Sequence, residues 1–151
     1  MTTNPTPATE VRISILSAAT PDIVAALNRL LPQLSSSPTL LGEDDLRALV
    51  DFPTVRILLA SVEGEPAGML SLGWISTPTG KKAFIDDVVV DERYRGRGIG
   101  EALVRSALDH ARRLGADTVD LTSRPSREAA NRLYQRIGFQ KRETNSYRYT
   151  L

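Results

Sequence analysis

One short segment of this sequence constrains the fold more than any other. The apolar, β-branched run Ala83–Val90 (AFIDDVVV) predicts a buried strand, and Ile99–Leu114 predicts an amphipathic helix that ends at Gly115. Between them lies the glycine-rich stretch Asp91–Gly100 (DERYRGRGIG). Such a turn lets backbone N–H groups converge at the positive end of a helix, where anions bind. The segment therefore predicts a phosphate-binding turn.

Two common phosphate-binding motifs do not fit this turn. A Walker loop needs G-x-x-x-x-G-K-[ST], which the chain lacks. A Rossmann turn needs G-x-G-x-x-G, and its third glycine would fall on Glu101. Arg95 and Arg97 add forked donors beside the turn, which favours a phosphate ligand over a bare strand-to-helix connection.

Hydrophobic periodicity predicts an α/β element order, βααβββαβαββ, in one domain over residues 11–151. Residues 1–10 are polar and are expected to form a disordered or frayed tail, and loops are expected over 35–42 and 76–82. Val55–Val62 and Ala67–Ile75 flank a turn signal and should form an antiparallel hairpin. The other strands are expected at Val11–Ser17, Ala83–Val90, Thr118–Thr122, Phe139–Arg142 and Tyr147–Leu151. Helices are expected at Pro21–Leu34, Glu43–Val50, Ile99–Leu114 and Arg127–Ile137.

Composition argues against several classes of function. The 151 residues carry a net charge of +1, which argues against nucleic-acid and membrane partners. There is no cysteine and His110 is the one histidine, so a thiolate metal site, a histidine metal cluster and a cysteine acyl-enzyme are all excluded. No apolar run approaches the roughly 20 residues of a spanning helix, and the N-terminus lacks a signal-peptide pattern. We expect a cytoplasmic protein without a metal.

A second motif, Asn131–Phe139 (NRLYQRIGF), follows the turn along the chain. Its Asn131 and Tyr134 stand at i and i+3, so they share one helix face. The spacing Arg95-x-x-Gly98-x-Gly100 resembles the R/Q-x-x-G-x-G/A motif of N-acetyltransferases of the GNAT superfamily. The second motif resembles the N-x-x-Y-x-x-x-G-F segment of the same family. The resemblance is strong over residues 83–139, whereas the N-terminal third matches only in its element pattern.

This resemblance implies an acetyl-CoA-dependent N-acetyltransferase with the GNAT fold, a mixed central sheet of about six to seven strands flanked by about four helices. The turn would bind the coenzyme A pyrophosphate, Asn131 would touch the pantetheine arm, and the Tyr134 hydroxyl would face the departing sulfur. Two strands would splay apart beside the coenzyme and free the backbone of Val88–Val90 for pantetheine. The coenzyme-binding residues expected on this basis are Val88, Val89, Val90, Arg95, Gly96, Arg97, Gly98, Ile99, Gly100, Asn131 and Tyr134.

Acetyl transfer also needs a base, because an alkylamine with a pKa of about 10.4 is mostly protonated near neutrality. Asp86 and Asp87 are the candidates, since they interrupt an otherwise apolar strand, where charge is expensive. Alternation sends the two side chains to opposite faces unless a bulge intervenes. In the family the carboxylate base commonly lies on this strand. A backbone N–H near Val88 would polarise the carbonyl, and Tyr134 would protonate the leaving thiolate.

The amine acceptor stays open, because the N-terminal third usually shapes the acceptor pocket in this family. We expect a small-molecule or peptide amine that attacks directly in a ternary complex, since no cysteine can carry the acetyl group. Three alternatives remain: an acyltransferase that uses a longer acyl-CoA, a non-catalytic acyl-CoA-binding regulatory domain, and a nucleotide-binding module. The sequence also leaves a homodimer open.

Overall fold

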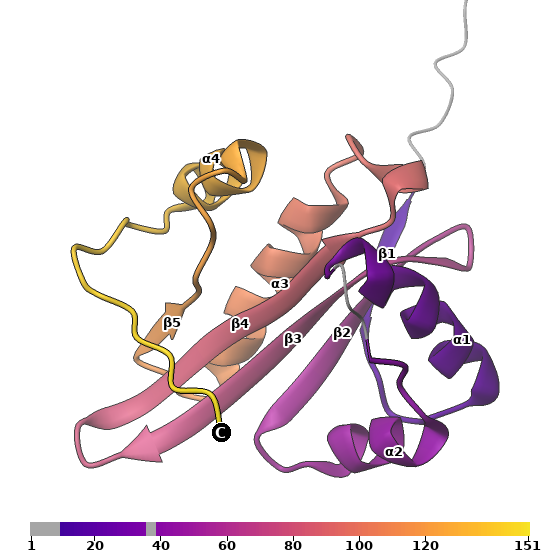
Figure 1. The fold of residues 1–151 in the computed structure, drawn as a ribbon, viewed down its shortest axis with the longest axis horizontal. Helices are drawn as coiled ribbons and strands as arrows, with labels where there is room; N and C mark the ends of the chain where they lie inside the picture. The colour runs from indigo at the N-terminus through magenta and orange to yellow at the C-terminus, as the bar shows by residue number, and fades with distance from the viewer. Residues whose placement is uncertain (1–9, 36–38) are drawn as a thin grey trace, which may run out of the picture.

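The computed structural model describes residues 10–35 and 39–151, which form an α/β arrangement around one five-stranded mixed sheet (Figure 1). The strand order is β1-β2-β3-β4-β5, and all neighbours are antiparallel except the parallel pair β4–β5. The strands are β1 (Val11–Ile15), β2 (Val55–Val62), β3 (Glu65–Thr77), β4 (Gly80–Val90) and β5 (Thr118–Asp120). The helices are α1 (Pro21–Leu30), η1 (Leu31–Gln33), α2 (Glu43–Asp51), η2 (Glu92–Tyr94), α3 (Ile99–Arg113) and α4 (Glu128–Ile137). Residues 1–9 of the predicted tail and residues 36–38 of the loop predicted over 35–42 lie outside the described residues.

Local chemistry sets the ends of the helices. At the start of α1, the Thr20 hydroxyl accepts a hydrogen bond from the Ile23 N–H at 3.3 Å, and Pro21 occupies a first-turn position where its missing N–H does no harm. At the end of α3, Gly115 adopts a φ of +77°, the left-handed conformation that glycine reaches without a Cβ penalty. These are the boundaries that the sequence predicts.

The sheet separates two apolar cores. On one face, α3 buries Ile99, Leu103 and Val104 against strand residues that include Leu58, Leu70 and Leu72. On the other face, α1 and α2 bury Leu27, Leu30 and Leu46 against Ile57, Leu59, Met69 and Val89. The strands between the two cores are apolar on both sides, which explains why β2 and β3 have nearly continuous apolar sequences.

A β-bulge interrupts the pairing of β3 with β4. Met69 pairs with Val89 and Ser71 pairs with Asp86, so Leu70 alone faces the two residues Asp87 and Val88. Asp87 takes up the extra length with a φ of +52°. The bulge reverses the alternation of β4: Ile85 belongs to the core under α3, whereas Val89 belongs to the core under α1 and α2.

Two strand predictions are wrong. In residues 139–151, all of which are described, no residue joins a strand, so the described sheet has five strands instead of six to seven. The predicted strands were Phe139–Arg142 and Tyr147–Leu151. Alternation favours a strand only where a sheet edge pairs with it, and Tyr147, Tyr149 and Leu151 are almost fully exposed. β5, with 3 residues, pairs with β4 alone.

The loop predicted over 76–82 is also wrong. β3 and β4 continue through it as a hairpin, in which Ser76 pairs with Lys81 and Thr77 with Gly80. Gly80 has a φ of +128°, and the Asp117 carboxylate accepts the Lys81 N–H at 3.1 Å. The tight turn depends on that contact from a residue far along the chain.

No helix within the described residues is long and apolar enough to cross a membrane.

Candidate active site

The turn between β4 and α3 has the backbone that an anion cradle requires. Gly96 and Gly98 have φ values of +79° and +75°, and Gly98 is the N-cap of α3. A Cβ at either position would meet nothing within 4 Å, so these glycines are required by conformation while the space beside them is open. Gly100 differs, because a Cβ there would contact Leu133 of α4 at 3.5 Å. The turn therefore has open space beside the N-terminus of α3, the end of a helix that favours an anion.

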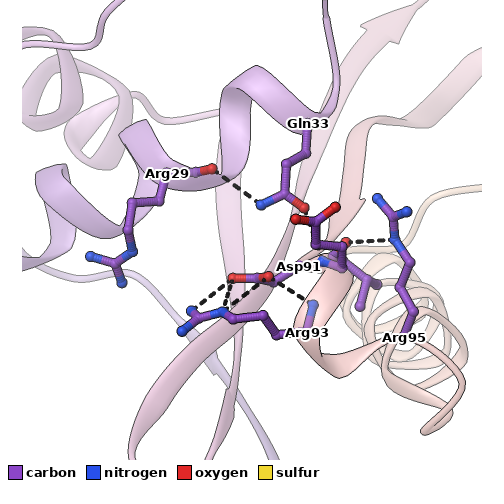
Figure 2. Close-up of polar contacts among 7 residues, drawn as sticks. Arg29, Gln33, Asp91, Arg93 and Arg95 are labelled. Carbon is purple, nitrogen blue, oxygen red and sulfur yellow. Dashed lines mark hydrogen bonds and ion pairs between the residues drawn. The ribbon is translucent and has the colours of Figure 1, made fainter.

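Arginines of this turn have different tasks. Arg93 is held by the buried Asp91, with its Nη2 2.9 Å from Oδ2, and this hydrogen bond holds the pKa of Asp91 below its usual range (Figure 2). Arg95 and Arg97 are exposed, and neither forms an ion pair within the described part of the chain. The Arg95 Nε donates to the Val90 carbonyl oxygen at 3.3 Å. Arg95 and Arg97 are thus the guanidinium groups available to a phosphate.

A glutamine from the N-terminal half braces the turn. The Gln33 Oε1 accepts the Glu92 N–H at 2.9 Å, and its Nε2 donates to the Arg29 carbonyl oxygen at 3.3 Å (Figure 2). This connection joins the end of α1 to the entry of the turn. Sequence reasoning missed Gln33 and the supporting role of Asp91, because only the fold brings Gln33 beside the turn.

The two candidate bases on β4 differ in their surroundings. The Asp86 Oδ1 accepts the N–H of Asp87 at 2.8 Å, which fixes the backbone of the bulge. Asp87 accepts a hydrogen bond from the Ser71 hydroxyl at 3.3 Å. Both aspartates are exposed to solvent. The protein around Asp87 nevertheless removes enough water from its carboxylate to raise its pKa, and repulsion from the Asp86 carboxylate raises it further.

Asp87 also forms part of the wall of a cavity of about 120 Å³ between α1, α2 and the sheet. Its hydrogen-bond partner in the wall is Ser71, and the other lining residues are apolar. A larger open depression of about 680 Å³ is lined by the consecutive residues Lys141–Asn145. Because one exposed segment forms that depression, it brings no distant groups together, and the cavity beside Asp87 is the better candidate for a ligand site.

The pairing of β4 with β5 is short. β5 pairs with Lys82, Ala83 and Phe84, so residues 85–90 of β4 have no strand partner on that side among residues 10–35 and 39–151. The short pairing leaves part of the Val88–Val90 backbone without a strand partner in the described chain, and the binding of pantetheine to these groups stays a prediction. Among those groups the Val90 carbonyl is occupied by Arg95.

Tyr134 and Asn131 lie on α4, as the second motif predicts. Tyr134 is 6% exposed, packs edge-on against Phe139 at 5.9 Å between ring centroids, and has a pKa raised by burial. No hydrogen bond of its hydroxyl is found in the described residues, and the hydroxyl is not among their fully enclosed unpaired atoms. The Asn131 Nδ2 donates to the carbonyl oxygens of Arg124 and Arg127, both at 2.9 Å, so its amide nitrogen holds the loop before α4.

The sequence and the fold have relatives among known proteins. The model of the acetyltransferase (GNAT) family matches residues 25–139. The chain is 34% identical over 88 residues to an uncharacterized N-acetyltransferase of Methanocaldococcus jannaschii, a match that covers 56% of this chain and 39% of that protein. It is 30% identical over 128 residues to glucosamine 6-phosphate N-acetyltransferase 1 of Oryza sativa subsp. japonica, covering 78% and 75%. An acetyltransferase structure from Trypanosoma brucei, 25% identical, matches with a TM-score of 0.76 over 94% of this chain and 100% of that one.

Proposed function

This chain belongs to the acetyltransferase (GNAT) family of enzymes, and we propose that it transfers an acetyl group from acetyl-CoA to a primary amine by direct attack in a ternary complex. The observation that carries the proposal is the open turn at the start of α3. A Cβ at Gly96 or Gly98 would meet nothing within 4 Å, and the exposed Arg95 and Arg97 have no carboxylate partner in the described residues. Such a site suits the pyrophosphate of a coenzyme.

The residues that would hold acetyl-CoA follow one side of the sheet. The backbone from Arg95 to Gly100 would bind the pyrophosphate, and the unpaired side of Val88–Val90 would bind pantetheine. Asn131 would contribute its side-chain oxygen, since its nitrogen already serves the loop before α4. Acetyl-CoA would supply the acetyl group as a thioester. A backbone N–H near Val88 would polarise the carbonyl as a one-donor oxyanion site.

Asp87 is the base in this mechanism. A carboxylate with a raised pKa is a stronger proton acceptor than an ordinary aspartate, and the cavity beside Asp87 gives an amine a place to bind. Asp86 has a structural task instead, because it accepts the Asp87 N–H. Asp87 would take the proton of the amine directly or through a water. Tyr134, whose ring is buried and whose hydroxyl has no hydrogen bond to another described residue, would return a proton to the leaving thiolate.

Release of free coenzyme A thiol from acetyl-CoA tests the function, with a panel of polyamines, aminosugars, amino acids and peptides. We expect release that depends on an amine, and intersecting double-reciprocal lines when both substrates are varied. Parallel lines together with an isolable acetylated protein would contradict direct attack. Acetyl-CoA binding without release for any amine would make the chain a binding domain. A cytoplasmic location and a homodimer stay predictions from the sequence.

A further inference from the structure

The cavity beside Asp87 has a mostly apolar wall. Two of its nine lining residues, Ser71 and Asp87, are polar, and they lie together because their side chains form a hydrogen bond. The rest of the wall comes from α1, η1, α2 and two strands of the sheet. The apolar lining residues are Leu27, Leu31, Leu41, Leu46, Leu49, Ile57 and Met69. An occupant would therefore meet the Asp87 carboxylate and the Ser71 hydroxyl at one end and hydrocarbon elsewhere.

The apolar wall is held in place by specific contacts. Leu41 precedes α2, and its backbone is clamped to α1 by the side chain of Asn28: the Asn28 Nδ2 donates to the Leu41 carbonyl oxygen and the Leu41 N–H donates to the Asn28 Oδ1, both at 2.9 Å. Leu46, at the back of the cavity, is fully buried. Both residues lie in defined backbone positions, which means that the cavity is formed before any ligand arrives.

The size of the cavity limits its occupant. An engineered apolar cavity of about 150 Å³ stays dry and binds benzene, and the cavity here has a volume of about 120 Å³. A short alkyl chain fits such a space, whereas a sugar ring or a peptide does not. A second charged group on the occupant would be buried without a partner, because Asp87 is the one ionisable group among the described residues that line the cavity.

We propose that the cavity receives the side chain of the acceptor, and that the acceptor is a compact primary amine with an uncharged aliphatic substituent. The inference rests on the proposed function, and it adds the class of amine. The ammonium group lies at Asp87, which accepts its proton, and the alkyl group lies among the leucines. The amine nitrogen forms the new amide bond to the acetyl carbon, the thioester bond breaks, and the sulfur leaves as coenzyme A thiol.

An isosteric pair of amines gives the sharpest test. Pentylamine and 1,4-diaminobutane have the same length, and the second carries a charge where the first carries a methyl group. We expect kcat/KM to rise roughly fourfold for each methylene from ethylamine until the cavity is full. We also expect pentylamine to exceed 1,4-diaminobutane by about a hundredfold or more. Equal rates for the pair, or a preference for the diamine, would overturn the inference.

A pair of leucine variants locates the effect. Leu49 lines the cavity and is 36% exposed, so Leu49→Ala should enlarge the mouth with a small loss of stability. Leu40→Ala is the control, because Leu40 is 74% exposed and does not line the cavity. We expect Leu49→Ala to shift the best substrate toward longer amines at unchanged acetyl-CoA affinity, and Leu40→Ala to match the wild type. Identical chain-length profiles in all three proteins would contradict the assignment.

A binding measurement separates this inference from the proposed function. Methyl NMR of the leucine, isoleucine and methionine side chains reports pentylamine in the cavity whether or not turnover occurs. Methyl shifts at Ile57 and Met69 without turnover would support the cavity assignment and reject the enzyme. Turnover with polar amines, without methyl shifts by pentylamine, would support the enzyme and reject the apolar acceptor. If neither turnover nor methyl shifts are observed, the proposed function and the apolar acceptor are both rejected.

Discussion

At the scale of the residue, the most informative position is Asp87. Its φ of +52° places it in the left-handed region, where asparagine and aspartate are better tolerated than most other residues with a side chain. The bulge turns its carboxylate toward Ser71 and the apolar cavity. The neighbouring Asp86 has the same side chain, but one of its carboxylate oxygens accepts a hydrogen bond from the Asp87 N–H. Two adjacent aspartates thus have different surroundings because of one inserted residue.

Replacing Asp87 by asparagine should remove the base and keep the bulge. We expect Asp87→Asn to lower kcat/KM by about a hundredfold or more at unchanged acetyl-CoA affinity. Asp86→Asn is the matched control, and because an amide oxygen can still accept the N–H of residue 87, its loss should be much smaller. An equal loss of kcat/KM in Asp87→Asn and Asp86→Asn would contradict the assignment of Asp87 as the base.

The raised pKa of Asp87 predicts how activity and stability change with pH. A base works when it is deprotonated, so the acidic limb of the kcat/KM profile should lie above the ordinary aspartate value of 3.8. Because the folded state binds this proton more tightly than the unfolded state, the contribution of Asp87 to stability is lost as pH rises from that value through its folded pKa. Asp87→Asn should therefore be at least as stable as the wild type in thermal unfolding at neutral pH. A marked drop in its melting temperature would contradict the desolvation of Asp87.

Tyr134→Phe should lower turnover and leave stability nearly unchanged, since the ring contact with Phe139 remains and the deleted hydroxyl has no hydrogen-bond partner in the described residues. Loss of a positioned acid typically reduces rates by about two to four orders of magnitude, and a thiol leaving group favours the lower end. The measurement is turnover with acyl donors of increasingly acidic thiols. The defect should shrink along this series. A constant defect would make Tyr134 a packing residue.

At the scale of the element, α3 begins and ends with a left-handed glycine. Gly98 and Gly115 have φ values of +75° and +77°, and a Cβ at either would meet nothing within 4 Å. Their local physics is the same, yet their places differ: Gly98 opens the helix beside Arg95 and Arg97, and Gly115 closes it. The positive end of the helix dipole makes only the first of these positions an anion site.

This symmetry supplies a matched pair of variants. Gly98→Glu and Gly115→Glu introduce the same charge and a similar backbone strain, of order 1–3 kcal/mol each. We expect calorimetry to show acetyl-CoA binding at least about tenfold weaker for Gly98→Glu and close to the wild type for Gly115→Glu, because only the first places a carboxylate against the pyrophosphate. Equal acetyl-CoA affinities in the two variants would show that the pyrophosphate does not bind at this turn.

At the scale of the whole molecule, the sheet divides the proposed chemistry between its faces. The core under α3 supports the turn and Tyr134, while the core under α1 and α2 surrounds the cavity beside Asp87. Gln33 joins the two regions through the Glu92 N–H. The C-terminal segment takes no part in either core beyond Phe139, which packs against the core under α3.

Removal of residues 147–151 should therefore leave the fold intact. Tyr147, Tyr149 and Leu151 are 90%, 89% and 113% exposed, and exposed residues contribute little to the free energy of unfolding. We expect the melting temperature of the shortened chain to stay within about 2 °C of the full chain. A larger fall would show that this segment pairs with a sheet in solution.

The sequence by itself determined the features that depend on neighbouring residues. The strand, the glycine turn and the helix over Ala83–Leu114 were predictable, because left-handed glycines and helix N-termini are local properties. Asn131 and Tyr134 were found by their shared helix face. The family followed from these motifs and is confirmed by the match over residues 25–139.

Only the tertiary structure decided what depends on distant partners. The bulge at Asp87 arises from pairing with β3, so alternation within β4 could not say which aspartate meets the cavity. The cavity takes its wall from α1, η1, α2, β2, β3 and β4, and each leucine in it has the same spacing as an ordinary core residue. Alternation in residues 139–151 predicted two strands, but no residue of this segment pairs with the sheet. A periodic pattern states that a face can be buried, and the partner that buries it is a property of the whole fold.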